Sequence, residues 1–144
     1  MLNKFNVTTE LRVTSAHRTP ESTHKYVKDA DQRGCAVFIA AAGLAAHLAG
    51  TVAGLTVKPV IGVPMDTGPL DGLDALLSTV QMPGGIPVAT MAIGKAGAKN
   101  AGYLAVEILA RSDPELEDQL RKEREENAKS ILEKNEAVQK LLKK

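Results

Sequence analysis

The residues best suited to chemistry lie together in one short run of the sequence, Ser15-Ala16-His17-Arg18-Thr19-Pro20. The run places a hydroxyl, an imidazole and a guanidinium close together, directly after residues 10–14, which read as a strand. In a parallel α/β sheet, ligands bind at the carboxyl ends of the strands. An imidazole titrates near neutral pH and a guanidinium is a permanent cation. The run therefore suits a small anionic substrate from which a proton must be moved.

The elements around this run alternate between strand and helix patterns. Thr19 and Pro20 are typical of a helix cap and a first helical position, and Gly34 is expected to end that helix. Further strands are predicted over residues 36–41, 59–63 and 88–93, and helices over residues 45–55, 72–80 and 97–110. This alternation predicts an α/β fold with a parallel sheet and right-handed crossovers.

The last part of the chain is far more highly charged than the central part. Asp113 and Pro114 form a second pair of cap and proline, which predicts the start of a long terminal helix. Its apolar positions recur mostly every three or four residues, at Leu116, Leu120, Ala128, Ile131, Val138 and Leu141. We therefore expect an α/β core over residues 1–112 and an amphipathic helix over residues 113–144 that packs on neighbouring subunits.

The composition of the chain argues against several classes of function. The 144 residues carry 18 basic and 17 acidic side chains, which gives no electrostatic reason to expect nucleic acid or an anionic membrane as partner. The single cysteine, Cys35, excludes an internal disulfide and fits a reducing compartment. No apolar run approaches the roughly 20 residues that span a bilayer, and no signal-peptide pattern is present, so a cytoplasmic protein is expected. The three histidines lack metal-ligand spacing, so no metal is expected.

Six segments, taken in order, resemble one known family. They are residues 15–20, 42–48, 59–64, 70–78, 81–90 and 97–101. Together they are similar to the class I PurE family, the N5-carboxyaminoimidazole ribonucleotide mutases of purine biosynthesis. Arg18-Thr19-Pro20 resembles the mutases, whereas related carboxylases that use free CO2 typically have a lysine and a glycine after the histidine. The resemblance implies a three-layer, flavodoxin-like parallel sheet.

The sequence also departs from the family pattern. Where the family often has Gly, Gly and Pro, this chain has Ala41, Leu44 and Ala49. The family begins with a strand, a Gly-Ser-x-Ser-Asp loop that holds much of the ribose and phosphate, and a helix, none of which occurs here. In the family's strand order, 2-1-3-4-5, that first strand lies inside the sheet. We therefore expect either a truncated sequence or a partner that supplies the strand.

The resemblance implies an isomerase that moves CO2 from N5 to C4 of the imidazole of its substrate, without ATP or cofactor. It implies that His17 is the general acid/base, a task that an imidazole can perform at neutral pH. It further implies that the ribonucleotide is bound by Ser15, Arg18, Gly43, Ala45, His47, Leu48, Met82, Pro83 and Gly84. The residues around Met82 would form a loop that closes over the ligand, and the subunits would form an octamer whose terminal helices embrace their neighbours.

Each of these residues also has a plainer interpretation. His17 could bond a nearby carbonyl, Arg18 could be a surface residue at a helix start, and Ser15 could make only a local turn bond. His47 reads as a packed residue inside an alanine-rich helix rather than as a catalyst. Residues 81–87 could be a rigid connector, and residues 99–100 could cap a helix as well as contact the site.

Two alternative functions remain open from the sequence. One is a carboxylase that acts on aminoimidazole ribonucleotide and free CO2, against which Arg18-Thr19 argues. The other is a non-catalytic assembly or binding module, because the phosphate-binding loop is absent from the sequence.

Overall fold

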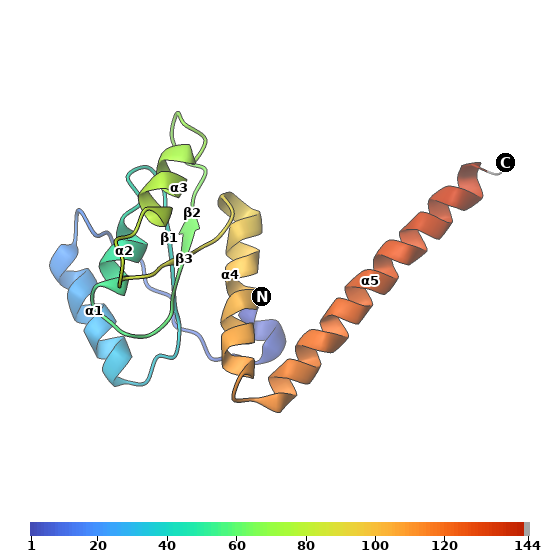
Figure 1. The fold of residues 1–144 in the computed structure, drawn as a ribbon, viewed down its shortest axis with the longest axis horizontal. Helices are drawn as coiled ribbons and strands as arrows, with labels where there is room; N and C mark the ends of the chain where they lie inside the picture. The colour runs from blue at the N-terminus through green and yellow to red at the C-terminus, as the bar shows by residue number, and fades with distance from the viewer. Residues whose placement is uncertain (143–144) are drawn as a thin grey trace. The chain divides into compact units, whose positions relative to one another are not determined.

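The computed structural model describes residues 1–142 and contains two compact units, one over residues 1–108 and one that begins at Leu109. In chain order, the elements are η1 (Leu2–Phe5), α1 (Pro20–Gln32), β1 (Phe38–Ala42), α2 (Leu48–Ala53), β2 (Val60–Pro64), α3 (Leu73–Val80), β3 (Ala89–Thr90), α4 (Gly94–Ala110) and α5 (Pro114–Leu142). Figure 1 shows the first unit as a sheet between helices and the second as a long helix.

A parallel sheet forms the centre of the first unit. Within the described residues its strands lie in the order β1-β2-β3, and both pairings are parallel. Phe38 of β1 lies opposite Val60 of β2, and Ile61 of β2 lies opposite Ala89 of β3. The predicted α/β class with a parallel sheet is therefore confirmed.

Helices cover both faces of this sheet. On one face, Phe38 belongs to the same buried cluster as Val27 of α1 and residues of α2. On the other face, Ile61 and Val63 of β2 cluster with Ala101 of α4. Ile61 has no exposed surface, and burying a side chain of that size stabilises the fold by roughly 1.5–3 kcal/mol. The result is a three-layer arrangement of helices, sheet and helix (Figure 1).

Gly62, at the centre of β2, allows α2 and α3 to approach the sheet closely. A Cβ at this position would lie 2.4 Å from Thr79 Cγ2, 2.9 Å from Val88 Cγ1 and 3.2 Å from Ala49 Cβ. Any side chain here would push the helices away from the strand, so the packing of this face requires glycine.

The strand predicted over residues 10–14 is wrong. Leu11 and Val13 are each 94% exposed, and among the described residues no backbone–backbone hydrogen bond involves residues 8–14. A strand exists only where a neighbouring strand accepts its hydrogen bonds. Within residues 1–142 the sheet contains only β1, β2 and β3, and residues 10–14 pair with none of them.

Two further elements have different bounds from those predicted, for local reasons. The strand predicted over residues 36–41 is Phe38–Ala42, because pairing begins where the Phe38 N–H donates to the Pro59 carbonyl. The helix predicted over residues 45–55 is shortened to Leu48–Ala53, because Leu44 takes a left-handed conformation with φ of 57°.

The strand predicted over residues 88–93 contracts to Ala89–Thr90, and the helix that follows begins at Gly94 rather than at residue 97. The chain bends sharply here, and a Cβ at Gly97 would lie only 1.6 Å from the Ala92 carbonyl oxygen. Lys99 and Asn100 therefore lie inside α4, and the interpretation of them as a helix cap is wrong.

The residues that begin and end α1 and that begin α5 agree with the sequence-based prediction. Pro20 is the first residue of α1, and Gly34, with φ of 89°, follows its end. Asp113 caps α5 through its Oδ1, which accepts hydrogen bonds from the backbone N–H groups of Glu115 at 3.0 Å and Leu116 at 3.2 Å. These three predictions are confirmed.

Helix α5 is long and carries exposed apolar side chains along its second half. Ile131, Val138 and Leu141 are 63%, 52% and 72% exposed. A hydrogen bond with Glu117 holds the pKa of Arg121 above its ordinary value. No helix within residues 1–142 has the length and apolar character needed to cross a membrane.

Replacing Gly62 by alanine should lower the free energy of unfolding by about 1–3 kcal/mol, because the new methyl group overpacks a buried strand. Urea or thermal unfolding measures this change. Gly54→Ala is the matched control, because Gly54 is already helical, with φ of −74°, and a Cβ there meets only atoms 3.6 Å away. Equal stability of the two variants would contradict the close approach at Gly62.

Candidate functional site

The loops that follow the strands meet at the carboxyl end of the sheet. A Cβ at Gly43, after β1, would lie 1.8 Å from Thr67 Oγ1, so the Thr67 side chain lies directly against the Gly43 backbone. A Cβ at Gly94, after β3, would likewise lie 3.1 Å from Asp66 Oδ2. The loop after β2 therefore contacts the loops on both sides of it.

The turn that carries His17 lies at this same end of the first unit. Helix α1 leads into β1 and runs in the opposite direction to the strands, so its first residues lie near the strands' carboxyl ends (Figure 1). Residues 16–18 form the turn just before α1. The turn therefore lies at the carboxyl end of the sheet, as predicted, although residues 10–14 do not form a strand.

Hydrogen bonds within the turn fix its backbone. The Thr19 N–H donates to the Ser15 carbonyl at 2.9 Å, and the Arg18 N–H donates to Ser15 Oγ at 3.1 Å. The local turn bond expected as the plainer role of Ser15 is therefore formed, and it leaves the serine O–H able to donate to a ligand. The side chains of His17 and Arg18 are exposed, so both can reach a substrate.

Thr19 occupies the cap position of α1, but its hydroxyl does not cap the helix. The helix has no side-chain cap bond at this end. Instead Thr19 Oγ1 accepts a hydrogen bond from the Ser15 N–H at 2.9 Å and lies 3.1 Å from Thr14 Oγ1. The predicted cap is wrong because the preceding turn competes for the hydroxyl.

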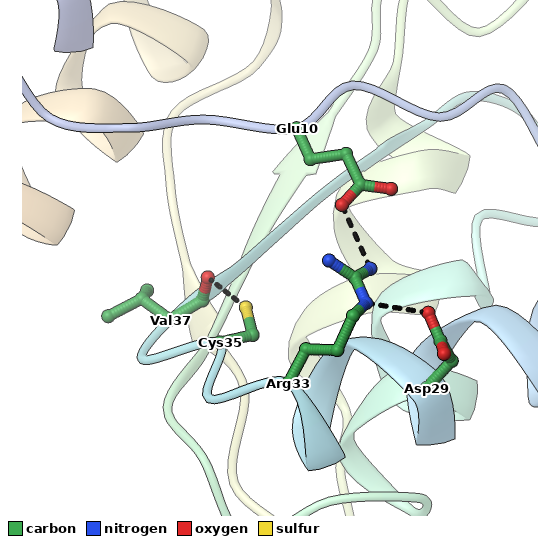
Figure 2. Close-up of polar contacts among 5 residues, drawn as sticks. All are labelled: Glu10, Asp29, Arg33, Cys35 and Val37. Carbon is green, nitrogen blue, oxygen red and sulfur yellow. Dashed lines mark hydrogen bonds and ion pairs between the residues drawn. The ribbon is translucent and has the colours of Figure 1, made fainter.

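Side chains attach the residues before the turn to α1. The Arg33 guanidinium donates to Glu10 at 2.9 Å and to Asp29 at 2.8 Å (Figure 2), and the Arg12 guanidinium lies 5.5 Å from the centre of the Tyr26 ring. The hydrogen bonds to Asp29 and Glu10 raise the pKa of Arg33. Since both ion-pair partners are exposed, salt screens this attachment.

Burial raises the pKa of the Tyr26 phenol, and the nearby negative charge of Glu10 raises it further. Figure 2 also shows the Cys35 thiol, which donates to the Val37 carbonyl at 3.3 Å. The Cys35 side chain is partly buried and packs against the core cluster that contains Phe38.

His47 lies at the start of α2 and not inside a helix, and its side chain is exposed. A Cβ at Gly50 would lie 2.6 Å from His47 Cε1 and 3.1 Å from Met82 Sδ. The imidazole and the thioether therefore both lie against the Gly50 backbone. The expectation that His47 is packed inside a helix is wrong, because the left-handed Leu44 delays the start of α2.

The structure brings the predicted substrate-binding residues into two groups. In the first, His47 of residues 43–48 and Met82 both lie against Gly50, and Pro83 and Gly84 follow in an exposed turn. Residues 15–18 form the second group, at the same end of the sheet. No hydrogen bond or ion pair joins the two groups within the described part of the chain.

Sequence reasoning missed Thr14 and Thr23, whose hydroxyls lie 2.6 Å apart beneath the turn. The spacing of threonines at positions 14, 19 and 23 was the only available signal, and it is a weak one. In residues 1–142 no group of three His, Cys, Asp or Glu side chains is placed to hold a metal ion.

Comparison with known proteins gives consistent matches. The family model described as AIR carboxylase matches residues 1–130. The N5-carboxyaminoimidazole ribonucleotide mutase of Bacillus subtilis is 51% identical over 138 residues, which cover 96% of this chain and 85% of that protein. The protein of the same name from Pyrococcus abyssi is 56% identical over 126 residues, which cover 88% of this chain and 71% of that protein.

Among solved structures, the crystal structure of Treponema denticola PurE matches with a TM-score of 0.79 at 30% identity. The match covers 92% of this chain and 81% of that one.

The raised pKa of Tyr26 predicts a loss of stability in alkali. Below pH 10.0, the ordinary pKa of tyrosine, the phenol is protonated in both states; above it, ionisation favours the unfolded chain until the folded pKa is passed. Tyr26→Phe keeps the ring that Arg12 contacts but cannot ionise. Its free energy of unfolding should therefore decline less between pH 9 and about pH 11 than that of the wild type, as measured by urea unfolding. Parallel declines would contradict the shift.

Proposed function

The chain belongs to the AIR carboxylase family, and we propose that it acts as an N5-carboxyaminoimidazole ribonucleotide mutase, an isomerase of purine biosynthesis. Support comes from two relatives of that name that are more than half identical to the chain. The observation that carries the proposal is the exposed His17 beside Arg18, on a hydrogen-bonded turn at the carboxyl end of the sheet.

In the proposed reaction, the bond between N5 and the carboxyl carbon breaks, and N5 takes up a proton. The released CO2 then forms a bond with C4 of the imidazole ring, and His17 removes the C4 proton as general base. The proton removed from C4 balances the proton gained at N5. The substrate is therefore isomerised with no net oxidation or reduction and no consumption of a second substrate.

The other predicted residues bind the substrate in this proposal. The Arg18 guanidinium pairs with an anionic group of the ribonucleotide, for which its planar donors are suited, and the Ser15 O–H donates to the phosphate. The loops around Gly43 and Met82 exclude water, so that CO2 released from N5 is recaptured by C4. The full set of proposed substrate-binding residues is Ser15, Arg18, Gly43, Ala45, His47, Leu48, Met82, Pro83 and Gly84.

We further propose that the chain is cytoplasmic and forms a homo-oligomer, an octamer, to which α5 contributes. Leu73, Leu77 and Val80 lie on one face of α3 and are 52%, 51% and 47% exposed. Exposed apolar faces of this kind mark surfaces that associate.

His17→Asn should lower kcat by about 10²–10⁴-fold, because the amide cannot accept the C4 proton. The measurement is conversion of N5-carboxyaminoimidazole ribonucleotide, with nucleotide binding followed by calorimetry. His24→Asn is the matched control, because His24 is an exposed histidine on α1.

Equal rates of His17→Asn and the wild type would reject the role of His17. A wild type that converts aminoimidazole ribonucleotide with free CO2, in preference to the N5-carboxylated substrate, would make it a carboxylase. A wild type that binds neither nucleotide would make it an assembly module.

Light scattering of the wild type should give eight times the 15.2 kDa mass of one chain. Leu77→Glu should reduce this mass, because a charge on the exposed face of α3 opposes burial. Val57→Glu is the control, because Val57 is 98% exposed and lies outside that face. A monomeric wild type would reject the proposed assembly.

A further inference from the structure

We propose that Thr23 is a positioning residue whose buried hydroxyl holds the turn that carries His17 and Arg18. The inference concerns the same site and rests on the proposed function. Thr23 belongs to the first turn of α1 and has no exposed surface, so its side chain is not open to a substrate. Any influence on the reaction must therefore pass through the backbone of residues 15–19.

The Thr23 hydroxyl contacts three groups of the preceding segment. Thr23 Oγ1 lies 2.6 Å from Thr14 Oγ1, 3.0 Å from the Thr19 carbonyl oxygen and 3.3 Å from the Ser15 carbonyl oxygen. The hydroxyl therefore connects the residue before the turn, the first residue of the turn and the residue that ends it.

The chemistry of these groups sets the direction of the hydrogen bonds. The two carbonyl oxygens can only accept, so the Thr23 proton is directed to them, and Thr14 donates its own proton to Thr23 Oγ1. Thr19 Oγ1 lies 3.1 Å from Thr14 Oγ1, accepts the Ser15 N–H at 2.9 Å and donates its own proton to the Ser15 carbonyl at 3.1 Å. The hydroxyls of Thr19 and Thr23 each have a donor and an acceptor role.

The turn needs such a support because its entry lacks backbone pairing. No backbone–backbone hydrogen bond involves residues 8–14 among the described residues. In the exposed part of the turn, water competes for the bonds of Ser15 and Thr19. The three bonds of the Thr23 hydroxyl, to Thr14, Ser15 and Thr19, are partly buried, so water competes less for them.

If Thr23 only stabilised its own helix, it would need fewer contacts than the structure shows. Threonine within a helix commonly bonds the carbonyl four residues back, and the bond to Thr19 is of that kind. Such a bond affects the helix but places no constraint on residues 14 and 15. The added contacts to Thr14 and Ser15 are what connect the helix to the turn.

Thr23→Val keeps the shape of the side chain and removes the hydroxyl, whereas Thr23→Ser keeps the hydroxyl. In the full-length protein, kcat/KM of Thr23→Val should fall by about 10–100-fold, mainly through kcat, because the imidazole is no longer held in line with C4. Thr23→Ser should remain within about threefold of the wild type, since the hydrogen bonds are kept.

Ser78→Ala is the matched control, because Ser78 Oγ bonds only the carbonyl of Asp74, four residues earlier, and should leave kcat/KM unchanged. Thr14→Val removes the same bond from its other end without altering α1. It should lower kcat/KM in the same direction and serves as the second variant if Thr23→Val does not fold. Wild-type kinetics in Thr14→Val and in any folded Thr23→Val would overturn the proposal.

A measurement that does not depend on turnover separates this inference from the proposed function. The imidazole proton signal of His17, identified by its loss in His17→Asn, should shift and broaden in Thr23→Val, while that of His47, which precedes α2, stays in place. If the wild type is inactive but this signal responds, the positioning role stands and the proposed function fails. If the wild type is active and neither the signal nor kcat/KM responds, the positioning role fails alone.

Discussion

Parallel pairing of the strands is the constraint on which the position of the site depends. Because β1, β2 and β3 run in one direction, the loops after them must meet at one end of the sheet. The contacts of Gly43 with Thr67 and of Gly94 with Asp66 are the direct consequence. Helix α1 runs the other way, so the turn before it reaches the same end (Figure 1). The turn and the loops thus lie at one end of the sheet, and no hydrogen bond or ion pair joins them within residues 1–142.

The turn that carries His17 and the loops after the strands are held by different kinds of interaction. The loops follow paired strands, whereas the residues before the turn have side-chain attachments only, from Arg33 to Glu10, from Arg12 to Tyr26 and from Thr14 to Thr23. The ion pair of Arg33 with Glu10 is exposed and weak, because water and salt compete with it. Segments with few backbone bonds open more readily than paired strands. The buried hydroxyl of Thr23 is therefore placed where the turn would otherwise be loosest.

The sequence predicted features that depend on neighbouring residues and missed those that depend on distant ones. Pro20 and Gly34 act on their own backbone, so the ends of α1 could be read directly. Leu11 and Val13 alternate with polar residues as in a strand, yet pairing depends on a partner that the pattern does not contain. The family could be recognised because its motifs, such as the one around His17, are local in sequence. Thr23 was missed because a buried hydroxyl looks like any other helical position until its partners are placed.

His47 also has a different environment from the one that the sequence predicts. An alanine-rich neighbourhood favours a helix, and a histidine inside a helix favours a structural role. The left-handed conformation of Leu44 delays the helix, which leaves the His47 side chain exposed at its start. Gly50 then provides room for the imidazole and for the sulfur of Met82, which no larger residue could do. The segments that carry His47 and Met82 therefore meet through these two side chains against the Gly50 backbone, with no covalent link between them.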